Sequence, residues 1–179
     1  MRRRLVSLGA VLTAALAGCG VGTAGPAPAG PPASGLRAPG SVQYNAQVYF
    51  VGPYGVRAVT RRVSHPASPQ QALDLLLKGP DAAERARGLI TEVPSMPGRP
   101  IATAEAGAVD LYLPVSVAGM TDGGGLGVTQ LVCTAANAVV PGGKQPPAVD
   151  VRVHEPGIPG TWTVRCNAAG NVVPVPNGS

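Results

Sequence analysis

The most regular pattern of hydrophobic and polar positions lies between residues 126 and 139. At about 100° per residue, its larger apolar side chains fall on one stripe, formed by Val128, Leu131, Val132, Ala135 and Val139. Gln130, Thr134 and Asn137 fall on the opposite side, and Cys133 lies on the flank between them. The pattern predicts a helix that rests on a sheet with its polar side facing outward.

A second helix is predicted after Ser68. Ser68 and Gln71 have the spacing of a capping box, and Pro69 suits the first helical position. The apolar stripe of this helix consists of Ala72, Leu73, Leu76 and Leu77. Gly79 is followed by a proline, which indicates that the helix ends there. Residues 81–87 are expected to form one more helical turn.

Extended runs surround the two main helices. Residues 47–51 and 56–63 are rich in β-branched and aromatic side chains, and the turn between them predicts a hairpin. Further strands are expected at about residues 100–105, 108–113, 149–154 and 161–167. The order β-β-α-β-β-α-β-β predicts an α+β fold, with two helices on one face of a mostly antiparallel sheet and a C-terminal strand extension.

The N-terminus has the layout of a secretory signal. Arg2, Arg3 and Arg4 precede an apolar run that is too short for a transmembrane helix of about 20 residues. The run ends in Leu16-Ala17-Gly18-Cys19, which resembles the lipobox of bacterial lipoproteins. The resemblance implies that residues 1–18 are a signal peptide and that Cys19 receives a diacylglycerol. An ordinary signal peptide with a chance cysteine is the alternative.

Residues 19–40 are predicted to be the lipidated N-terminus and a tether. The segment is dense in glycine, proline and alanine, and such a composition buries too little apolar surface to offset the entropy of ordering. The folded domain is then expected at residues 41–173, followed by a short tail at 174–179. This organisation would place the domain on the extracytoplasmic side of the cell membrane, attached through its lipid.

The charge of the chain argues against a nucleic-acid partner. The formal net charge is +5, but removal of residues 1–18 takes away three of the 14 basic residues and leaves +2. Aromatic residues make up only 3% of the sequence. A nucleic-acid-binding domain would need a clustered basic face with stacking aromatics, so we expect no such partner.

Several short segments, in this order, resemble the GerMN domain of the sporulation and spore germination protein family. They are VYFV at 48–51, ALDLLLKGP at 72–80, GLITEVP at 88–94, VDL at 109–111 and QLVCT at 130–134. The resemblance covers about residues 45–153. It implies a non-enzymatic extracytoplasmic module, related in shape to ring-building domains of secretion-like assemblies. Family members include envelope lipoproteins of actinobacteria, and the heavy use of alanine, glycine, proline, valine and arginine suits a high-GC source.

The chain departs from that family in three respects. It has one copy of the domain instead of a tandem pair, which argues against carrying over a role in germination. Cys133 stands where the family usually has an aromatic residue. The segment with Trp162 and Cys166 lies outside the family pattern.

With Cys19 lipidated, Cys133 and Cys166 remain as an even pair in an oxidising compartment. A disulfide between them is the natural expectation, and the length of the closed loop gives about 3–4 kcal/mol in the chain-entropy model. Two unpaired buried thiols are the alternative. The disulfide would make the C-terminal extension an integral part of the domain.

The residues that could carry chemistry form no recognisable set. His65 and His154 lack the spacing of metal ligands, and Asp110 has no partner in sequence for acid–base work. The glycine-rich segment 123–127 fits neither dinucleotide nor phosphate-loop patterns. Trp162 is expected to pack the last strands on the core. We therefore expect no enzyme activity, no cofactor and no metal.

Together these features predict a non-enzymatic lipoprotein that acts as a protein-interaction or accessory module for an unidentified envelope protein. The alternative is a lipoprotein that captures a cell-wall fragment or another small molecule. A deep apolar pocket with converging polar groups would favour the alternative.

Overall fold

The computed structural model of the chain describes residues 42–118, 120 and 125–176. The predicted signal peptide, Cys19 and the predicted tether lie outside the described residues, as do positions 123 and 124 of the glycine-rich segment. Within the described part of the chain, no helix has the length and apolar character needed to cross a membrane.

Seven strands and three helices are formed by the described residues. In chain order they are β1 (Tyr44–Gly52), β2 (Gly55–Val63), α1 (Pro69–Leu77), α2 (Ala82–Ala86), β3 (Ile101–Glu105), β4 (Ala108–Tyr112), α3 (Leu126–Ala136), β5 (Asp150–His154), β6 (Trp162–Cys166) and β7 (Val172–Pro174).

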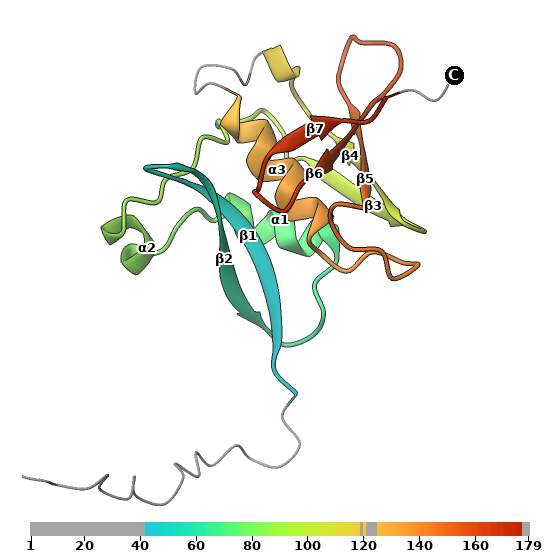
Figure 1. Cartoon of the computed structure of the whole chain (residues 1–179). Coiled ribbons are helices and arrows are strands. Elements are labelled where there is room, and N and C mark those ends of the chain that lie inside the picture. The colour runs from blue at the N-terminus through green and yellow to red at the C-terminus, as the bar shows by residue number, and fades with distance from the viewer. Residues whose placement is uncertain (1–41, 119, 121–124, 177–179) are drawn as a thin grey trace, which may run out of the picture. The chain divides into compact units, whose positions relative to one another are not determined.

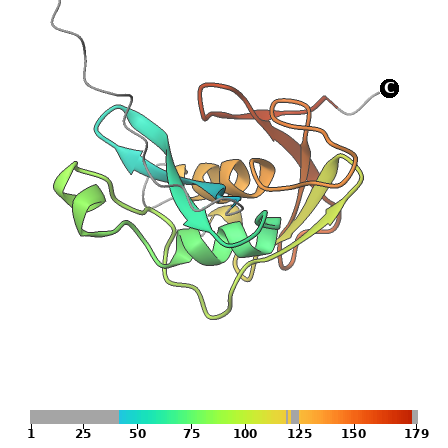
Figure 2. The same ribbon diagram turned by 90° about the horizontal axis from the view of Figure 1, so that it is seen from below.

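The strands divide into two sheets. β1 and β2 form an antiparallel hairpin, and the other five strands form a sheet in the order β3-β4-β5-β6-β7. Only the β4–β5 pair in that sheet is parallel. α3 lies between the hairpin and the larger sheet, and α1 packs beside it (Figure 1, Figure 2). The predicted α+β class, with two helices packed on a mostly antiparallel sheet, is confirmed, and the two-sheet arrangement adds to it.

α1 begins and ends where its capping residues predict. The Ser68 side chain accepts a hydrogen bond from the Gln71 amide, and the Gln71 side chain accepts one from the Ser68 amide. Gly79 has a φ of +75°, the left-handed conformation that ends a helix at low cost only with glycine. Leu77 was expected in the buried stripe, but it is 39% exposed because it lies at the margin of that stripe.

The predicted orientation of α3 is wrong for its polar side. Gln130 and Thr134 are fully buried, because the hairpin covers the side of the helix that faces away from the five-stranded sheet. The helix also ends at Ala136, three positions before the predicted end, and Val139 is therefore 56% exposed instead of part of the stripe. A helix between two sheets buries both of its sides, which a single-sheet pattern does not anticipate.

The buried polar groups of α3 attach it to β1. The Tyr49 amide donates to Thr134 Oγ1 at 3.0 Å, and Gln130 Nε2 donates to the Tyr49 carbonyl at 2.8 Å. Gln130 Oε1 also accepts a hydrogen bond from the Glu92 amide at 2.7 Å. At Gly127, an added Cβ would lie 2.6 Å from the Glu92 carbonyl oxygen, so this close approach requires glycine.

A disulfide attaches the other side of α3 to the C-terminal strands. Cys133 and Cys166 of β6 are bonded, their Cα atoms are 5.0 Å apart, and both residues are fully buried. β6 pairs with β5 and β7, so the C-terminal extension belongs to the five-stranded sheet. The extension is thus an integral part of the domain.

Thr134→Val tests the attachment of α3 to β1. The change keeps the shape of the side chain but leaves the buried Tyr49 amide without its acceptor, so the free energy of unfolding should fall by about 1–3 kcal/mol. Urea denaturation of the purified protein measures this loss. Thr129→Val is the matched control, because the Thr129 side chain is only partly buried on the same helix. Equal stability of the two variants would contradict the role given to the Thr134 hydroxyl.

Candidate functional site

The residues with potential for acid–base chemistry lie on the outer face of the five-stranded sheet. Asp110 accepts a hydrogen bond from Arg152 Nη2 at 2.6 Å, and its other oxygen lies 2.8 Å from His154 Nε2. Arg152 also binds Glu105, and the two carboxylates raise the pKa of its guanidinium, Glu105 most strongly. The His154 ring stacks on Tyr112 with centroids 4.1 Å apart. Both Asp110 oxygens are thus occupied in a cross-strand network that joins β3, β4 and β5.

The other residues singled out from the sequence do not join this network. His65 lies on the loop after β2, where its Nδ1 is 3.3 Å from the Pro66 carbonyl. Trp162 packs against the core and donates its indole N–H to Glu155 at 2.7 Å. Among the described residues, no group of three or more His, Cys, Asp or Glu side chains is placed to hold a metal ion.

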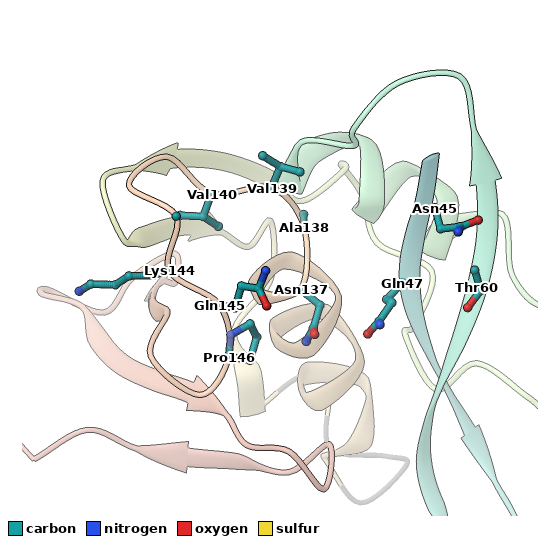
Figure 3. Close-up of a pocket in the computed structure, with 11 residues that line it drawn as sticks. Asn45, Gln47, Thr60, Asn137, Ala138, Val139, Val140, Lys144, Gln145 and Pro146 are labelled. Atoms are coloured by element: carbon teal, nitrogen blue, oxygen red, sulfur yellow. The ribbon is translucent and has the colours of Figure 1, made fainter. Parts of the chain in front are cut away.

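A cleft of about 440 Å³ lies between the hairpin and the segment that follows α3. Its lining includes the amide and hydroxyl side chains of Asn45, Gln47, Thr60, Asn137 and Gln145. Gln47 points from β1 toward the end of α3 that carries Asn137, whereas Lys144 points away from the cleft (Figure 3). The cleft is therefore polar and open, unlike a deep apolar pocket.

Apart from that of β2, the sheet edges in the described residues are partly covered or short. The outer edge of β1 is bound by α3 at Tyr49, and at Val51 by two hydrogen bonds to the Ile90 backbone, at 2.9 and 2.8 Å. At β3, the Ala102 amide donates to the Gln70 side chain at 2.8 Å. β7 spans only three residues. These are the usual ways in which proteins protect the backbone groups of an edge strand.

The outer edge of β2 is different. In an antiparallel ladder, every second pair of opposite residues directs its backbone N–H and C=O groups away from the other strand. Tyr49 and Val51 belong to such pairs, and their partners on β2 are Ala58 and Val56. The outward-facing residues of β2 are therefore Val56, Ala58, Thr60 and Arg62. No described residue forms a hydrogen bond with their outward backbone groups. Ala58, Thr60 and Arg62 are exposed.

The hairpin is held from its other face by an ion pair. Arg61 on β2 binds Glu84 on α2 with two hydrogen bonds, and its Nη2 is 2.6 Å from Glu84 Oε2. Glu84 is only 2% exposed. Arg61 also binds Asp81, whose pKa is lowered chiefly by the hydrogen bond from the Glu84 amide and further by the charge of Arg61. The stability that Asp81 contributes is consequently lost as the pH falls through that lowered pKa.

Three arginines that form no ion pair among the described residues lie on β2 or near it. Arg61, Arg99, Arg152 and Arg165 are each paired with an acidic side chain. By contrast, no ion pair in the described part of the chain includes Arg57, Arg62 or Arg87. Arg57 and Arg87 line a hollow of about 160 Å³ beside Ala58, together with Pro53, Val59 and Leu89. The open backbone edge thus has a basic border.

Comparison of the chain with protein-family models, with curated proteins and with solved structures gave no match. The resemblance to the GerMN domain therefore stays a prediction from the sequence. The arrangement around β2 was missed by the sequence reasoning, which identified the strand but not its free edge. The closely spaced Arg57, Arg61 and Arg62 were the available signal, because charged side chains are frequent on edge strands.

Glu84→Gln tests whether the ion pair holds the hairpin in place. Removing the charge leaves the largely buried Arg61 guanidinium with only the exposed Asp81 as a counterion, so the free energy of unfolding should fall by about 2 kcal/mol. Asp74→Asn is the control, because Asp74 and Arg99 are both exposed and such pairs contribute about 0–1 kcal/mol. Chemical denaturation measures both variants. A loss at Glu84 no greater than that at Asp74 would contradict this role.

Proposed function

We propose that the chain is a non-enzymatic lipoprotein, anchored through Cys19 on the extracytoplasmic face of the cell membrane, that binds another protein of the envelope. The lipobox and the tether-like composition of residues 19–40 support the anchor. The predicted oxidising compartment agrees with the presence of the Cys133–Cys166 disulfide.

One observation carries the protein-binding part of the proposal. The outer edge of β2 offers a row of unpaired backbone donors and acceptors at Ala58, Thr60 and Arg62, while the other edges discussed above are partly covered or short. An exposed edge of this kind is a template for pairing with another polypeptide. The hairpin is held firmly by α3 and by the Arg61–Glu84 pair, so little ordering of β2 would be needed on binding.

The polar cleft favours a second candidate function, the capture of a cell-wall fragment. Amide and hydroxyl groups from β1, β2 and the segment after α3 converge on it, and such groups suit a saccharide or a peptide rich in hydrogen-bonding groups. This role would use the same lipid anchor but a different surface from the β2 edge.

Cys19→Ala tests the anchor and the partner together. We expect the wild-type protein to partition into membranes and, after crosslinking in those membranes, to yield one reproducible envelope protein. The variant lacks the sulfur that carries the lipid, so lipid labelling, membrane retention and recovery of the partner should all be lost. Labelled and membrane-bound variant protein would contradict the anchor. Wild-type protein that is retained in membranes but crosslinks to nothing would contradict the protein-binding role.

Gln47→Ala tests the cleft. If the second candidate function holds, a soluble disaccharide-peptide of the cell wall should bind the full-length protein in detergent, and the variant should bind about tenfold more weakly because one amide is lost. Calorimetric titration measures both affinities. Gln43→Ala is the control, since Gln43 is exposed and is not among the residues that line the cleft. Absence of binding to the wild-type protein would remove this candidate.

A further inference from the structure

We infer that the β2 edge binds an acidic, extended segment of another protein, which adds to the hairpin as a third strand. The inference rests on the proposed protein-binding function and specifies the chemistry of the partner. It is carried by three features of the same place in the fold: the unpaired backbone edge, the uncompensated arginines around it and the hollow beside Ala58.

The backbone edge sets the conformation of the partner. Ala58, Thr60 and Arg62 direct their amide and carbonyl groups outward at the spacing of every second residue, whereas the Val56 carbonyl lies beside Gly170 of the turn between β6 and β7. Only an extended chain presents complementary groups at that spacing. The part of β2 from Arg57 to Val63 is long enough for an edge strand, since strands in proteins are commonly about 5–6 residues long.

The charges set the composition of the partner. Arg57 and Arg62 belong to opposite faces of the hairpin, because side chains alternate along a strand. Both arginines are exposed and lack a carboxylate among the described residues, and Arg87 from the end of α2 lies beside Arg57 in the hollow. A third strand with carboxylates on both of its faces would neutralise this border.

The hollow beside Ala58 can hold one side chain of the partner strand. Its walls combine the apolar side chains of Pro53, Val59 and Leu89 with Arg57 and Arg87. At about 160 Å³ it is of the size for a single side chain rather than for a free ligand, since ligand sites generally occupy about 300 Å³ or more. An aliphatic side chain flanked by acidic ones matches this lining.

Two other occupants fit less well. In a second copy of this chain, β2 paired antiparallel about Val59 would place Arg57 opposite Arg61 of the copy, and like charges directly opposite are destabilising. The chain's own residues 19–40 contain five prolines, at 26, 28, 31, 32 and 39, and proline lacks the amide hydrogen that a ladder requires. In that antiparallel register about Val59 the arginines oppose self-pairing, and they favour an acidic strand.

The test uses full-length, lipidated protein in detergent and a labelled, capped peptide as long as β2. The peptide contains valine and glutamate, arranged so that both faces of the extended chain carry carboxylates. Fluorescence anisotropy should show saturable binding of this peptide. A peptide with lysine in place of glutamate should bind at least about tenfold more weakly, because the arginines would then repel it.

Backbone methylation separates strand pairing from plain charge attraction. Methyl groups on the peptide nitrogens that face β2 should abolish binding, whereas methyl groups on the alternate nitrogens, which face solvent, should leave the affinity within about twofold. Equal effects of the two methylation patterns would overturn the third-strand geometry. Equal binding of the glutamate and lysine peptides would overturn the acidic character of the partner.

Charge reversal on the protein gives an independent readout. Arg57→Glu and Arg62→Glu should each weaken binding of the glutamate peptide by about tenfold, and Lys78→Glu, an exposed cation on α1's end, should not. Circular dichroism verifies that each variant is folded, and the methylated peptides remain decisive if one is not. Concentration-dependent dimers that dissociate in the Arg62→Glu variant would identify a second copy as the occupant and overturn the inference.

The membrane crosslinking separates this inference from the function on which it rests. A partner that is recovered equally by wild type, Arg57→Glu and Arg62→Glu would retain the protein-binding role and overturn the β2 edge as its site. Loss of the partner in both arginine variants, with recovery in Lys78→Glu, would support the inference.

Discussion

The hydrogen bonds between α3 and the backbone of β1 hold the two halves of this fold together. A two-stranded hairpin is marginally stable in water by itself, so β1 and β2 depend on what they pack against. Thr134 and Gln130 bind the amide and carbonyl of Tyr49, and Gln130 extends the contact to the Glu92 amide. Side chains thereby take the place that a third backbone strand would occupy on β1.

That substitution explains the layout of the domain. α3 is fixed to the hairpin by these hydrogen bonds on one side and to β6 by the Cys133–Cys166 disulfide on the other. The helix consequently buries both of its sides, and the two sheets share it as a common support (Figure 2). With Tyr49 and Val51 of β1 bound in this way, the longest run of unpaired backbone groups on the hairpin lies on β2. The proposed interaction surface is therefore a consequence of how the core is assembled.

Charge pairing divides the surface into two kinds of region. On the outer face of the five-stranded sheet, Arg152 and Arg165 are bound to carboxylates on neighbouring strands, so those charges are internally compensated. Around β2, Arg61 is paired with Glu84 and Asp81, whereas Arg57 and Arg62 form no ion pair among the described residues. Uncompensated charge beside an open backbone edge is what distinguishes the hairpin as a place for a partner of opposite charge.

The sequence by itself determined the features that depend on neighbouring residues. The caps of α1, the β1–β2 hairpin and the α+β class follow from local turn chemistry and from the spacing of apolar residues. Only the tertiary structure decided that Gln130 and Thr134 are buried and that β2 is an edge with uncompensated arginines. A polar side chain has the same helical position whether water or a backbone amide is its partner, and a strand has the same alternation at an edge or in a sheet. Those outcomes depend on contacts between residues far apart in the chain, as between Tyr49 and Thr134.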